Sequence, residues 1–257
     1  MKYISSRDNG DFKAIKRLAQ SGRERRSQGR TLLDGVHLIQ AYEASIAPVE
    51  TLIVNEAAVQ QAEIAELIAG RTGLMLSEAL FREAAVVDTP SGVMAVALTP
   101  MPAIADPHVD TVLLDGVQDP GNVGTLLRTA AAAGFRQILL SADCASVWSP
   151  RVLRAGQGAH FSLSLVEGNT LADFIRAFQG MTAVTTLTNG SPLFKCDLRG
   201  TVAWIFGSEG QGVRPEIVAL ANQQVTIPMP GAVESLNVGA AAAICLFETV
   251  RQRLFLA

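Results

Sequence analysis

The sequence has few residues of the kinds that cross-link a chain or bind a metal. It contains three cysteines and three histidines in 257 residues. The cysteines form no CxxC pair and lie far apart, at Cys144, Cys196 and Cys245. An odd number of separated cysteines argues against a disulfide framework and against a zinc site. We therefore expect ordinary, mostly buried thiols and no bound metal.

Long apolar runs are also missing. The longest uncharged, apolar-rich window near the C-terminus runs from Ser235 to Phe247, well short of the ~20 residues that span a bilayer as a helix. We therefore expect no transmembrane segment. The N-terminus carries charges where a signal peptide needs its apolar stretch, so export is not indicated and the cytoplasm is the expected compartment.

Several common catalytic and nucleotide-binding motifs are absent. Gly121 and Gly124 are not in a GxGxxG frame, and neither GxxxxGK[ST] nor GxSxG occurs. This argues against a dinucleotide-binding fold, a P-loop enzyme and a serine hydrolase with a nucleophile elbow. The histidines lie outside the glycine-rich segments described below, so histidine-dependent acid–base chemistry is not expected.

The composition is that of a chain with a sizeable core, because 49% of the residues are hydrophobic and 18% are charged. A proline-rich stretch at residues 99–107, TPMPAIADP, is typical of a linker. It divides the chain into a domain at residues 1–100 and a second domain at residues 106–257. Because the second domain alternates apolar strands with helical stretches, it is predicted to be α/β with a parallel sheet covered on both faces.

The predicted elements of the second domain follow its apolar periodicity. Strands are expected at Thr111–Leu114, Gln137–Leu140, Ser162–Val166, Thr182–Leu187, Val202–Phe206 and Val225–Ile227. The last helix is expected at about Leu236–Phe255, and one apolar face of it, predicted to be core, carries Ile244, Phe247, Val250 and Leu254. The first domain is predicted to be a small α/β unit with an amphipathic helix around Phe12, Ile15 and Leu18, strands at Thr51–Val54 and Gly92–Leu98, and a helix at Ala57–Ala69.

Positive charge is concentrated at the N-terminus. Residues 1–30 hold nine basic and three acidic side chains, whereas the whole chain has a net charge of −3. Such a cluster is typical of a contact with a phosphate backbone, and a solvated helix face is the alternative. The candidate residues for such a contact are Lys13, Lys16, Arg17, Arg23, Arg25, Arg26 and Arg30.

Three segments of the second domain place glycine and polar residues after a predicted strand, where open α/β sheets bind ligands. The first segment is LLDGVQDPGNVGTLLRTAAAAGF. Its Asn122 is either a helix cap or a ligand contact. Its Arg128 lies in an alanine-rich helix and pairs either with a ligand or with a surface carboxylate. The second, WIFGSEGQGV, surrounds Glu209 with three glycines. The third, VTIPMPGAVESLNVGA, contains Ser235 and Asn237, which could both be plain N-cap residues.

In order, spacing and content these segments resemble the three motifs of the SpoU (TrmH-like) RNA 2′-O-ribose methyltransferases of the SPOUT superfamily. The matching stretches are DPGNVGTLLRTAAAAGF, FGSEGQGV and IPMPGAVESLNVGAAAAICLFE, within about residues 111–253. The first hundred residues are similar to the ribosomal-protein-like RNA-binding domain that often precedes this catalytic domain. The resemblance implies a trefoil-knotted parallel-sheet domain, a homodimer and an RNA partner, ribosomal RNA rather than transfer RNA.

The resemblance also implies a cofactor and a set of roles. S-adenosylmethionine would be held by Leu187, Thr188, Gly207, Ile227, Met229 and Leu236, and no metal is needed because the donor is already a cation. The catalytic set would be Arg128, Asn122, Glu209, Ser235 and Asn237. Arg128 is either the base of the reaction or, since arginine stays protonated, an orienting group. A transfer-RNA enzyme, a base-nitrogen methyltransferase and a catalytically silent assembly factor remain as alternatives.

Overall fold

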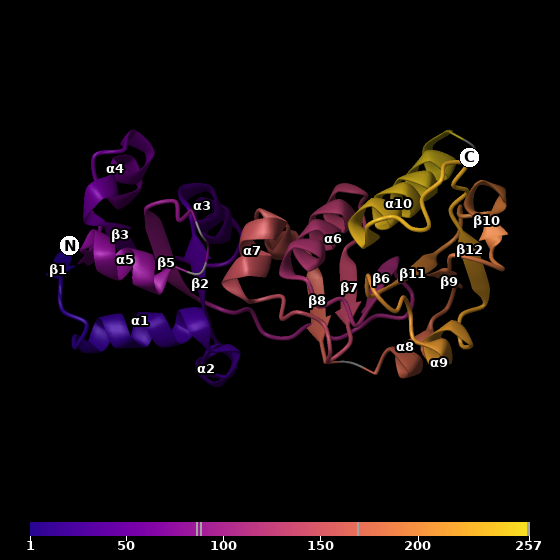
Figure 1. Cartoon of the computed structure of the whole chain (residues 1–257), viewed down its shortest axis with the longest axis horizontal. Helices are drawn as coiled ribbons and strands as arrows, with labels where there is room; N and C mark the ends of the chain where they lie inside the picture. The colour runs from indigo at the N-terminus through magenta and orange to yellow at the C-terminus, as the bar shows by residue number, and fades with distance from the viewer. Residues whose placement is uncertain (86, 88, 169, 256–257) are drawn as a thin grey trace. The chain divides into compact units, whose positions relative to one another are not determined.

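The computed structural model describes residues 1–85, 87, 89–168 and 170–255, which form two compact units (Figure 1). Unit 1 comprises Met1–Met101 together with Trp148–Phe161. Unit 2 comprises Pro102–Val147 together with the chain from Ser162 onward. The sequence-based division assigns all of residues 106–257 to the second domain, whereas the segment Trp148–Phe161 packs within unit 1.

Unit 1 contains a five-stranded mixed sheet with the order β1-β4-β3-β5-β2. Strands β1, β4 and β3 pair in parallel, and β5 runs antiparallel to its neighbours β3 and β2. The strands are β1 Lys2–Ile4, β2 Arg30–Asp34, β3 Thr51–Asn55, β4 Gly73–Leu76 and β5 Val93–Leu98. The helices of this unit are α1 Gly10–Gln20, α2 Gly22–Gln28, α3 Val36–Ser45, α4 Ala62–Ile68, α5 Glu78–Ala84 and α7 Pro150–Gly156.

Alternation of side chains along these strands gives unit 1 two apolar layers. Leu32, Ile53 and Met94 pack with residues of α1 and α5 on one face. The neighbouring strand residues Leu33 and Val54 pack with α3 and α4 on the other. The amphipathic helix expected near the N-terminus is therefore confirmed as α1, whose buried residues are Phe12, Ile15, Leu18 and Ala19.

Helix α7 packs in the apolar layer formed with α3 and α4, although it follows strand β7 of unit 2 in the chain. Leu153 is fully buried in that apolar cluster. Arg154 Nη1 donates to Asp34 Oδ2 at 2.6 Å, and the Asp34 side chain is only 2% exposed. The hydroxyl of Thr31 donates to the carbonyl of Trp148 at 2.6 Å. Local sequence gave no sign of this packing, because its partners lie more than a hundred residues away in the chain.

Unit 2 contains a seven-stranded sheet in which every pairing is parallel, with the order β10-β12-β9-β11-β6-β7-β8. Its strands are β6 Thr111–Asp115, β7 Gln137–Leu140, β8 Ser164–Glu167, β9 Met181–Thr185, β10 Ser191–Pro192, β11 Val202–Gly207 and β12 Gln223–Thr226. The six strands expected in the second domain are confirmed to within a few residues. The two-residue β10 was not expected, because it is too short to show periodicity.

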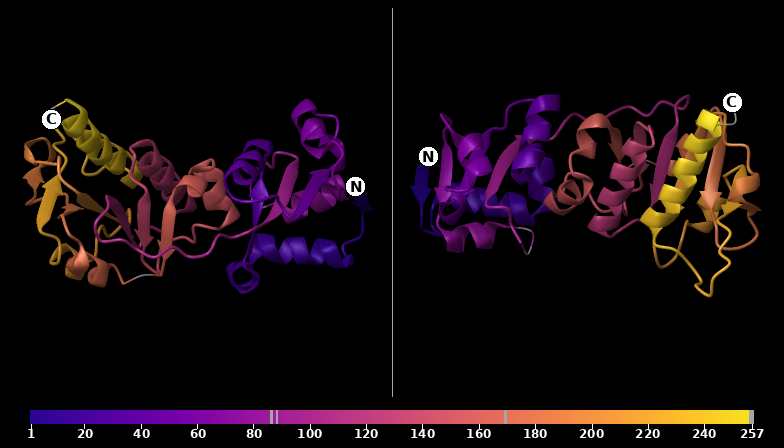
Figure 2. Two further views of the ribbon diagram at one scale, coloured as in Figure 1. Left: turned by 180° about the vertical axis from the view of Figure 1, so that it is seen from behind. Right: turned by 90° about the horizontal axis from the view of Figure 1, so that it is seen from above.

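Helices cover both faces of the unit 2 sheet (Figure 2). Helices α8, Leu171–Ala177, and α9, Pro215–Val218, pack on a face that includes Leu113 and Ile205. Helices α6, Pro120–Ala132, and α10, Val238–Phe255, lie side by side on the other face. Among the described residues no helix is both long enough and apolar enough to cross a membrane.

The prediction that Ile244, Phe247, Val250 and Leu254 form the buried face of the last helix is wrong. Phe247 is 47% exposed and Leu254 is 69% exposed, and Ile244 and Val250 are only partly buried. Helix α10 instead buries a face of smaller and more polar residues, which includes Ala242, Cys245, Leu246, Thr249 and Gln252. The neighbouring α6 and the indole of Trp204, which donates to Thr249 Oγ1 at 3.0 Å, leave room only for that face.

The packing of α7 in unit 1 leads to a stability prediction. Leu153→Ala should lower the free energy of unfolding by about 2–5 kcal/mol, because it leaves a cavity in a packed core. In a Trp204→Phe background, the fluorescence of Trp148 reports urea unfolding of unit 1. Leu98→Ala removes the same atoms from a side chain that is 47% exposed, and it should change the midpoint little. An unchanged midpoint for Leu153→Ala would contradict this packing.

Candidate functional site

A cavity of about 540 Å³ lies in unit 2, where β9, β11 and β12 end. Because the strands are parallel, their carboxyl ends lie at one edge of the sheet, where open α/β folds bind ligands. Five of the six residues expected to hold a cofactor line the cavity, namely Leu187, Gly207, Ile227, Met229 and Leu236. Thr188 belongs to the same loop as Leu187, but it is exposed and is not part of the lining.

The glycine-rich loop after β11 is closed by its own backbone. Ser208 N donates to Gly212 O at 3.1 Å, and Gly212 N donates to Ser208 O at 2.9 Å. Gly212 has a φ of +69°, a conformation that favours glycine. A Cβ on Gly207 would lie 2.1 Å from the carbonyl carbon of Gly212. The loop therefore folds back onto β11 only because residue 207 has no side chain.

Residues from all three motifs form one hydrogen-bonded chain beside this cavity. Asn237 Nδ2 donates to Asn122 Oδ1 at 2.9 Å. The amide nitrogen of Asn122 donates in turn to Glu209 Oε1. Glu209 lines the cavity, as does the nearby Ser235. Four of the five expected catalytic residues therefore gather at the cavity or directly beside it.

The two asparagines differ in their capping roles. Asn237 Oδ1 accepts hydrogen bonds from Gly239 N at 2.9 Å and Ala240 N at 3.3 Å, which is N-cap geometry for α10. Its amide nitrogen remains available for Asn122. The N-cap of α6 is Asp119, which accepts from the backbone of Asn122 at 2.8 Å. The side chain of Asn122 is thus not used as the cap and can serve the site.

Arg128 is not part of this hydrogen-bonded chain. It lies six residues after Asn122 on α6, which places it about 9 Å further along the helix axis and on another helix face. Its side chain is exposed, and no described residue forms a hydrogen bond or ion pair with it. Within a single chain, Arg128 also does not line the cavity.

The sequence reasoning missed an ion pair that anchors the glycine-rich loop. The buried carboxylate of Asp115, at the end of β6, accepts from Arg214 N at 2.8 Å and from Arg214 Nε at 2.9 Å. Hydrogen bonding to Asp115 raises the pKa of Arg214 above its ordinary value. No local signal could have revealed the pair, because the partners are 99 residues apart. The hydroxyl of Thr186, also missed, lines the cavity and is buried without a partner among the described residues.

The basic N-terminal residues of unit 1 are not equivalent. Lys13 pairs with Asp8 at 2.9 Å, Lys16 with Glu83 at 2.6 Å, and Arg30 with Glu50 through two hydrogen bonds. Arg25 Nη1 donates to the carbonyls of Leu18 and Ala19. Among the residues that the structure describes, none forms an ion pair with the side chains of Arg17, Arg23 or Arg26.

Two family models match the chain. Residues 110–247 match the SpoU rRNA Methylase family, and residues 9–95 match an MRM3-like substrate binding domain. The chain is 32% identical over 249 residues to the 23S rRNA (guanosine(2553)-2′-O)-methyltransferase RlmP of Bacillus subtilis, covering 96% of this chain and 98% of that protein.

Solved structures resemble the whole chain. A crystal structure of an RNA 2′-O ribose methyltransferase has a TM-score of 0.85 at 31% identity, covering 98% of this chain and all of the other. The SpoU methyltransferase AviRb from Streptomyces viridochromogenes, solved with the cofactor AdoMet (S-adenosylmethionine), has a TM-score of 0.83 at 26% identity. That match covers 96% of this chain and 99% of AviRb.

The close approach at Gly207 predicts a sharp contrast between two glycines of one loop. Gly207→Ala should abolish measurable binding of S-adenosylmethionine in calorimetry, because the added carbon would overlap the Gly212 backbone and displace the loop. Gly210→Ala is the matched control, since a Cβ there meets no atom within 4 Å. Equal affinities for the two variants would contradict the loop geometry, and a thermal melt would separate a displaced loop from an unfolded chain.

The fold and the comparisons agree on what this chain is. The matched stretch, residues 110–247, is more than half of the chain and contains the cavity loops and the bonded set Asn122, Glu209 and Asn237. The likeness to the Bacillus subtilis relative extends over nearly the full length of both chains. The chain belongs to the SpoU rRNA methylase family.

Proposed function

We propose that this protein transfers a methyl group from S-adenosylmethionine to a ribose 2′-hydroxyl of ribosomal RNA in the cytoplasm. The observation that carries the proposal is the hydrogen-bonded chain Asn237–Asn122–Glu209, in which three motifs distant in sequence meet beside one cavity. The family and the activity in the name of the Bacillus subtilis relative support ribosomal RNA as the substrate.

The residues around the cavity fit the proposed cofactor. Thr186 offers a buried hydroxyl that a polar ligand would satisfy, and the carboxylates of Glu209 and Glu234 suit a cationic ligand. Leu187, Ile227 and other apolar residues supply walls for an adenine ring. When bound, S-adenosylmethionine supplies an electrophilic methyl group on a sulfonium, so the reaction needs no metal.

The chain's own residues have to align the ribose and deal with its proton. The 2′-hydroxyl is a weak acid that loses its proton as the oxygen attacks, which requires close alignment. We assign the positioning of the nucleotide to Asn122 and Asn237, whose mutual hydrogen bond fixes their orientation. A guanidinium stays protonated at working pH, so Arg128 does not take the proton. It holds an RNA phosphate beside the hydroxyl, and an oxygen of that phosphate receives the proton and passes it to solvent.

A homodimer completes the site in this proposal. Arg128 is exposed and distant along α6 from Asn122, so one copy would supply it to the cavity of its partner. The neighbouring α10 exposes Phe247 and Leu254, an apolar face that water does not favour. A second copy packed against α6 and α10 would cover that face and place the arginine.

The trefoil knot is the remaining part of the proposal. Strand β9 lies between β12 and β11 in the sheet, although β11 and β12 follow one another in the chain. The segments after all three strands line one cavity. We propose that the C-terminal segment, which leads into α10, is threaded through an earlier loop of unit 2.

The enzyme proposal predicts transfer of radiolabelled methyl to unmodified ribosomal RNA and not to transfer RNA. Arg128→Ala should lower the rate about 100-fold with cofactor affinity unchanged, because it removes a group that acts on the RNA. Arg136→Ala, which removes another exposed arginine of the same region, should retain full activity. Full transfer by Arg128→Ala at saturating RNA and cofactor would reject the assigned mechanism. Label only in transfer RNA would reject the substrate.

The dimer predicts a sedimenting mass twice the chain mass of 27.2 kDa at micromolar concentration. Phe247→Glu should shift the protein toward the monomer, because it places a charge in the apolar contact. Glu216→Gln, a change at another exposed position, should leave the dimer intact. A monomeric wild-type protein with full methyl transfer would refute the shared site.

A further inference from the structure

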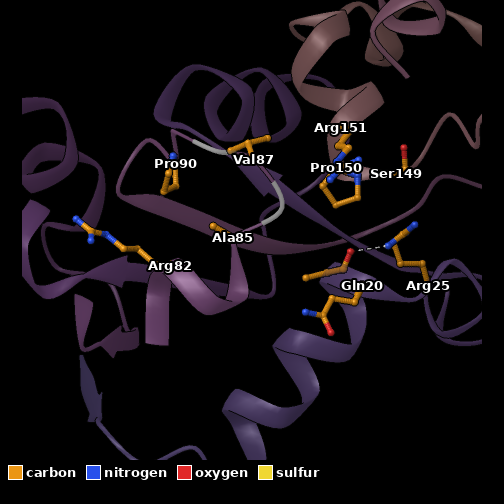
Figure 3. Close-up of a pocket in the computed structure, with 10 residues that line it drawn as sticks. Gln20, Arg25, Arg82, Ala85, Val87, Pro90, Ser149, Pro150 and Arg151 are labelled. Carbon is orange, nitrogen blue, oxygen red and sulfur yellow. Dashed lines mark hydrogen bonds between the residues drawn. The ribbon is translucent and has the colours of Figure 1, made fainter. Parts of the chain in front are cut away.

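Two arginines hold chain segments beside cavities, and they reach partners at very different distances in the sequence. In unit 1, Arg25 lines a cavity of about 680 Å³, and its Nη1 donates to the carbonyls of Leu18 and Ala19 at the end of α1 (Figure 3). That contact stays within the corner between α1 and α2. In unit 2, Arg214 bonds to Asp115, which is 99 residues away. The second contact ties the end of β6 to the residue that follows the glycine-rich loop.

The carboxylate of Asp115 is buried, and Arg214 occupies both of its oxygens. Its side chain is only 1% exposed. Oδ2 accepts from Arg214 N at 2.8 Å, and Oδ1 accepts from Nε at 2.9 Å and lies 2.6 Å from Nη2. Asp143 and Glu216 approach the same guanidinium only to 3.9 Å, and both are exposed. A carboxylate removed from water needs a charged, hydrogen-bonded partner, and Arg214 supplies it.

Both ends of the glycine-rich loop, residues 208–213, are fixed at Asp115. At the near end, Gly207 is the register partner of Asp115 in the pairing of β11 with β6. At the far end, the backbone N of Arg214 bonds to Asp115, and the Arg214 carbonyl accepts two hydrogen bonds from the backbone of α9. Every residue from 208 to 213 lines the cavity of unit 2. The Asp115 carboxylate therefore holds one complete wall of that cavity.

We propose that Asp115 and Arg214 are positioning residues for the methyl donor, and that their ion pair keeps the loop in the shape that accepts S-adenosylmethionine. The inference rests on the proposed function for the identity of the ligand. A loop whose ends are fixed loses less conformational entropy on binding. Without the pair, open forms of the loop gain population, and the apparent affinity falls with the fraction that stays closed. The loop also carries Glu209, which the pair keeps within reach of Asn122.

A second ion pair, at the other end of β6, separates positioning from stability. Asp110 lies just before β6 and accepts from Arg253 Nη2 of α10 at 2.9 Å and from Val202 N at 2.9 Å. Both side chains of the pair are largely buried, at 28% and 26% exposed. Arg214 directly follows the loop that lines the cavity, whereas neither Asp110 nor Arg253 adjoins a lining residue in the chain. The two pairs therefore share their chemistry and their sheet and differ in their relation to the cavity.

The first measurement is calorimetric binding of S-adenosylmethionine to the full-length protein. Arg214→Gln and Asp115→Asn should each weaken the affinity about tenfold, because the closed loop becomes a minor form. Arg214→Lys should recover part of the loss, since it restores the charge but not the paired bonds. Arg253→Gln is the matched control. It should lower the unfolding midpoint, reported by Trp204 fluorescence in a Trp148→Phe background, and leave the affinity unchanged.

Hydrogen exchange without cofactor tests the loop itself. The amides of Ser208 and Gly212 bond across the loop, and they should exchange faster in Arg214→Gln and Asp115→Asn than in the wild type or in Arg253→Gln. In steady-state kinetics the same two variants should raise KM for the cofactor and leave kcat unchanged at saturation. An ion pair that served only stability would not separate these quantities.

Two outcomes would overturn the positioning role. One is wild-type affinity together with wild-type exchange in Asp115→Asn, which decides the matter even if Arg214→Gln does not fold. The other is an equal loss of affinity in Arg253→Gln, because the effect would then be one of general stability. A wild type that binds S-adenosylmethionine without transferring methyl would refute the enzyme and leave this role intact, whereas a wild type that does not bind it would refute both.

Discussion

Strand β11 pairs with β6 along one edge and with β9 along the other, and the geometry of the site depends on this pairing. The register sets Gly207 opposite Asp115 of β6 and Ile205 opposite Val184 of β9. Since all of these strands are parallel, their carboxyl ends lie together, and the loops that follow β9, β11 and β12 line one cavity. A register shift of one residue would turn Gly207 to the other face and separate the loops.

The loop after β11 is held by several hydrogen bonds. Each of them costs little conformational entropy, because its partner is already ordered. Its backbone closes on itself between Ser208 and Gly212, and Arg214 neutralises the buried carboxylate of Asp115. An unpaired carboxylate at that depth would be costly. Because the loop backbone is already ordered, Glu209 meets Asn122 with a smaller loss of conformational entropy, as a preorganised site requires.

Charge in unit 1 is distributed more narrowly than the count of basic residues implies. Glu50 and Glu83, both outside the basic segment, pair with Arg30 and Lys16 in the folded chain. The side chains of Arg17, Arg23 and Arg26, on α1 and α2, form no ion pair with the residues that the structure describes. Ion pairing in the folded chain therefore leaves fewer unpaired cations on unit 1 than a count along the sequence suggests.

The strands of unit 2, the basic helix α1 and the motif residues Asn122, Glu209 and Asn237 were all predictable from the sequence, because periodicity, charge and motif spacing are local properties. Three other features became visible in the folded chain: α7 belongs to unit 1, Asp119 rather than Asn122 caps α6, and α10 exposes Phe247. The partners that settle these points are set by strand order and helix packing, as when Asp115 meets Arg214 from 99 residues away. Contacts between such distant residues leave no periodic trace in either segment, so the folded chain alone can reveal them.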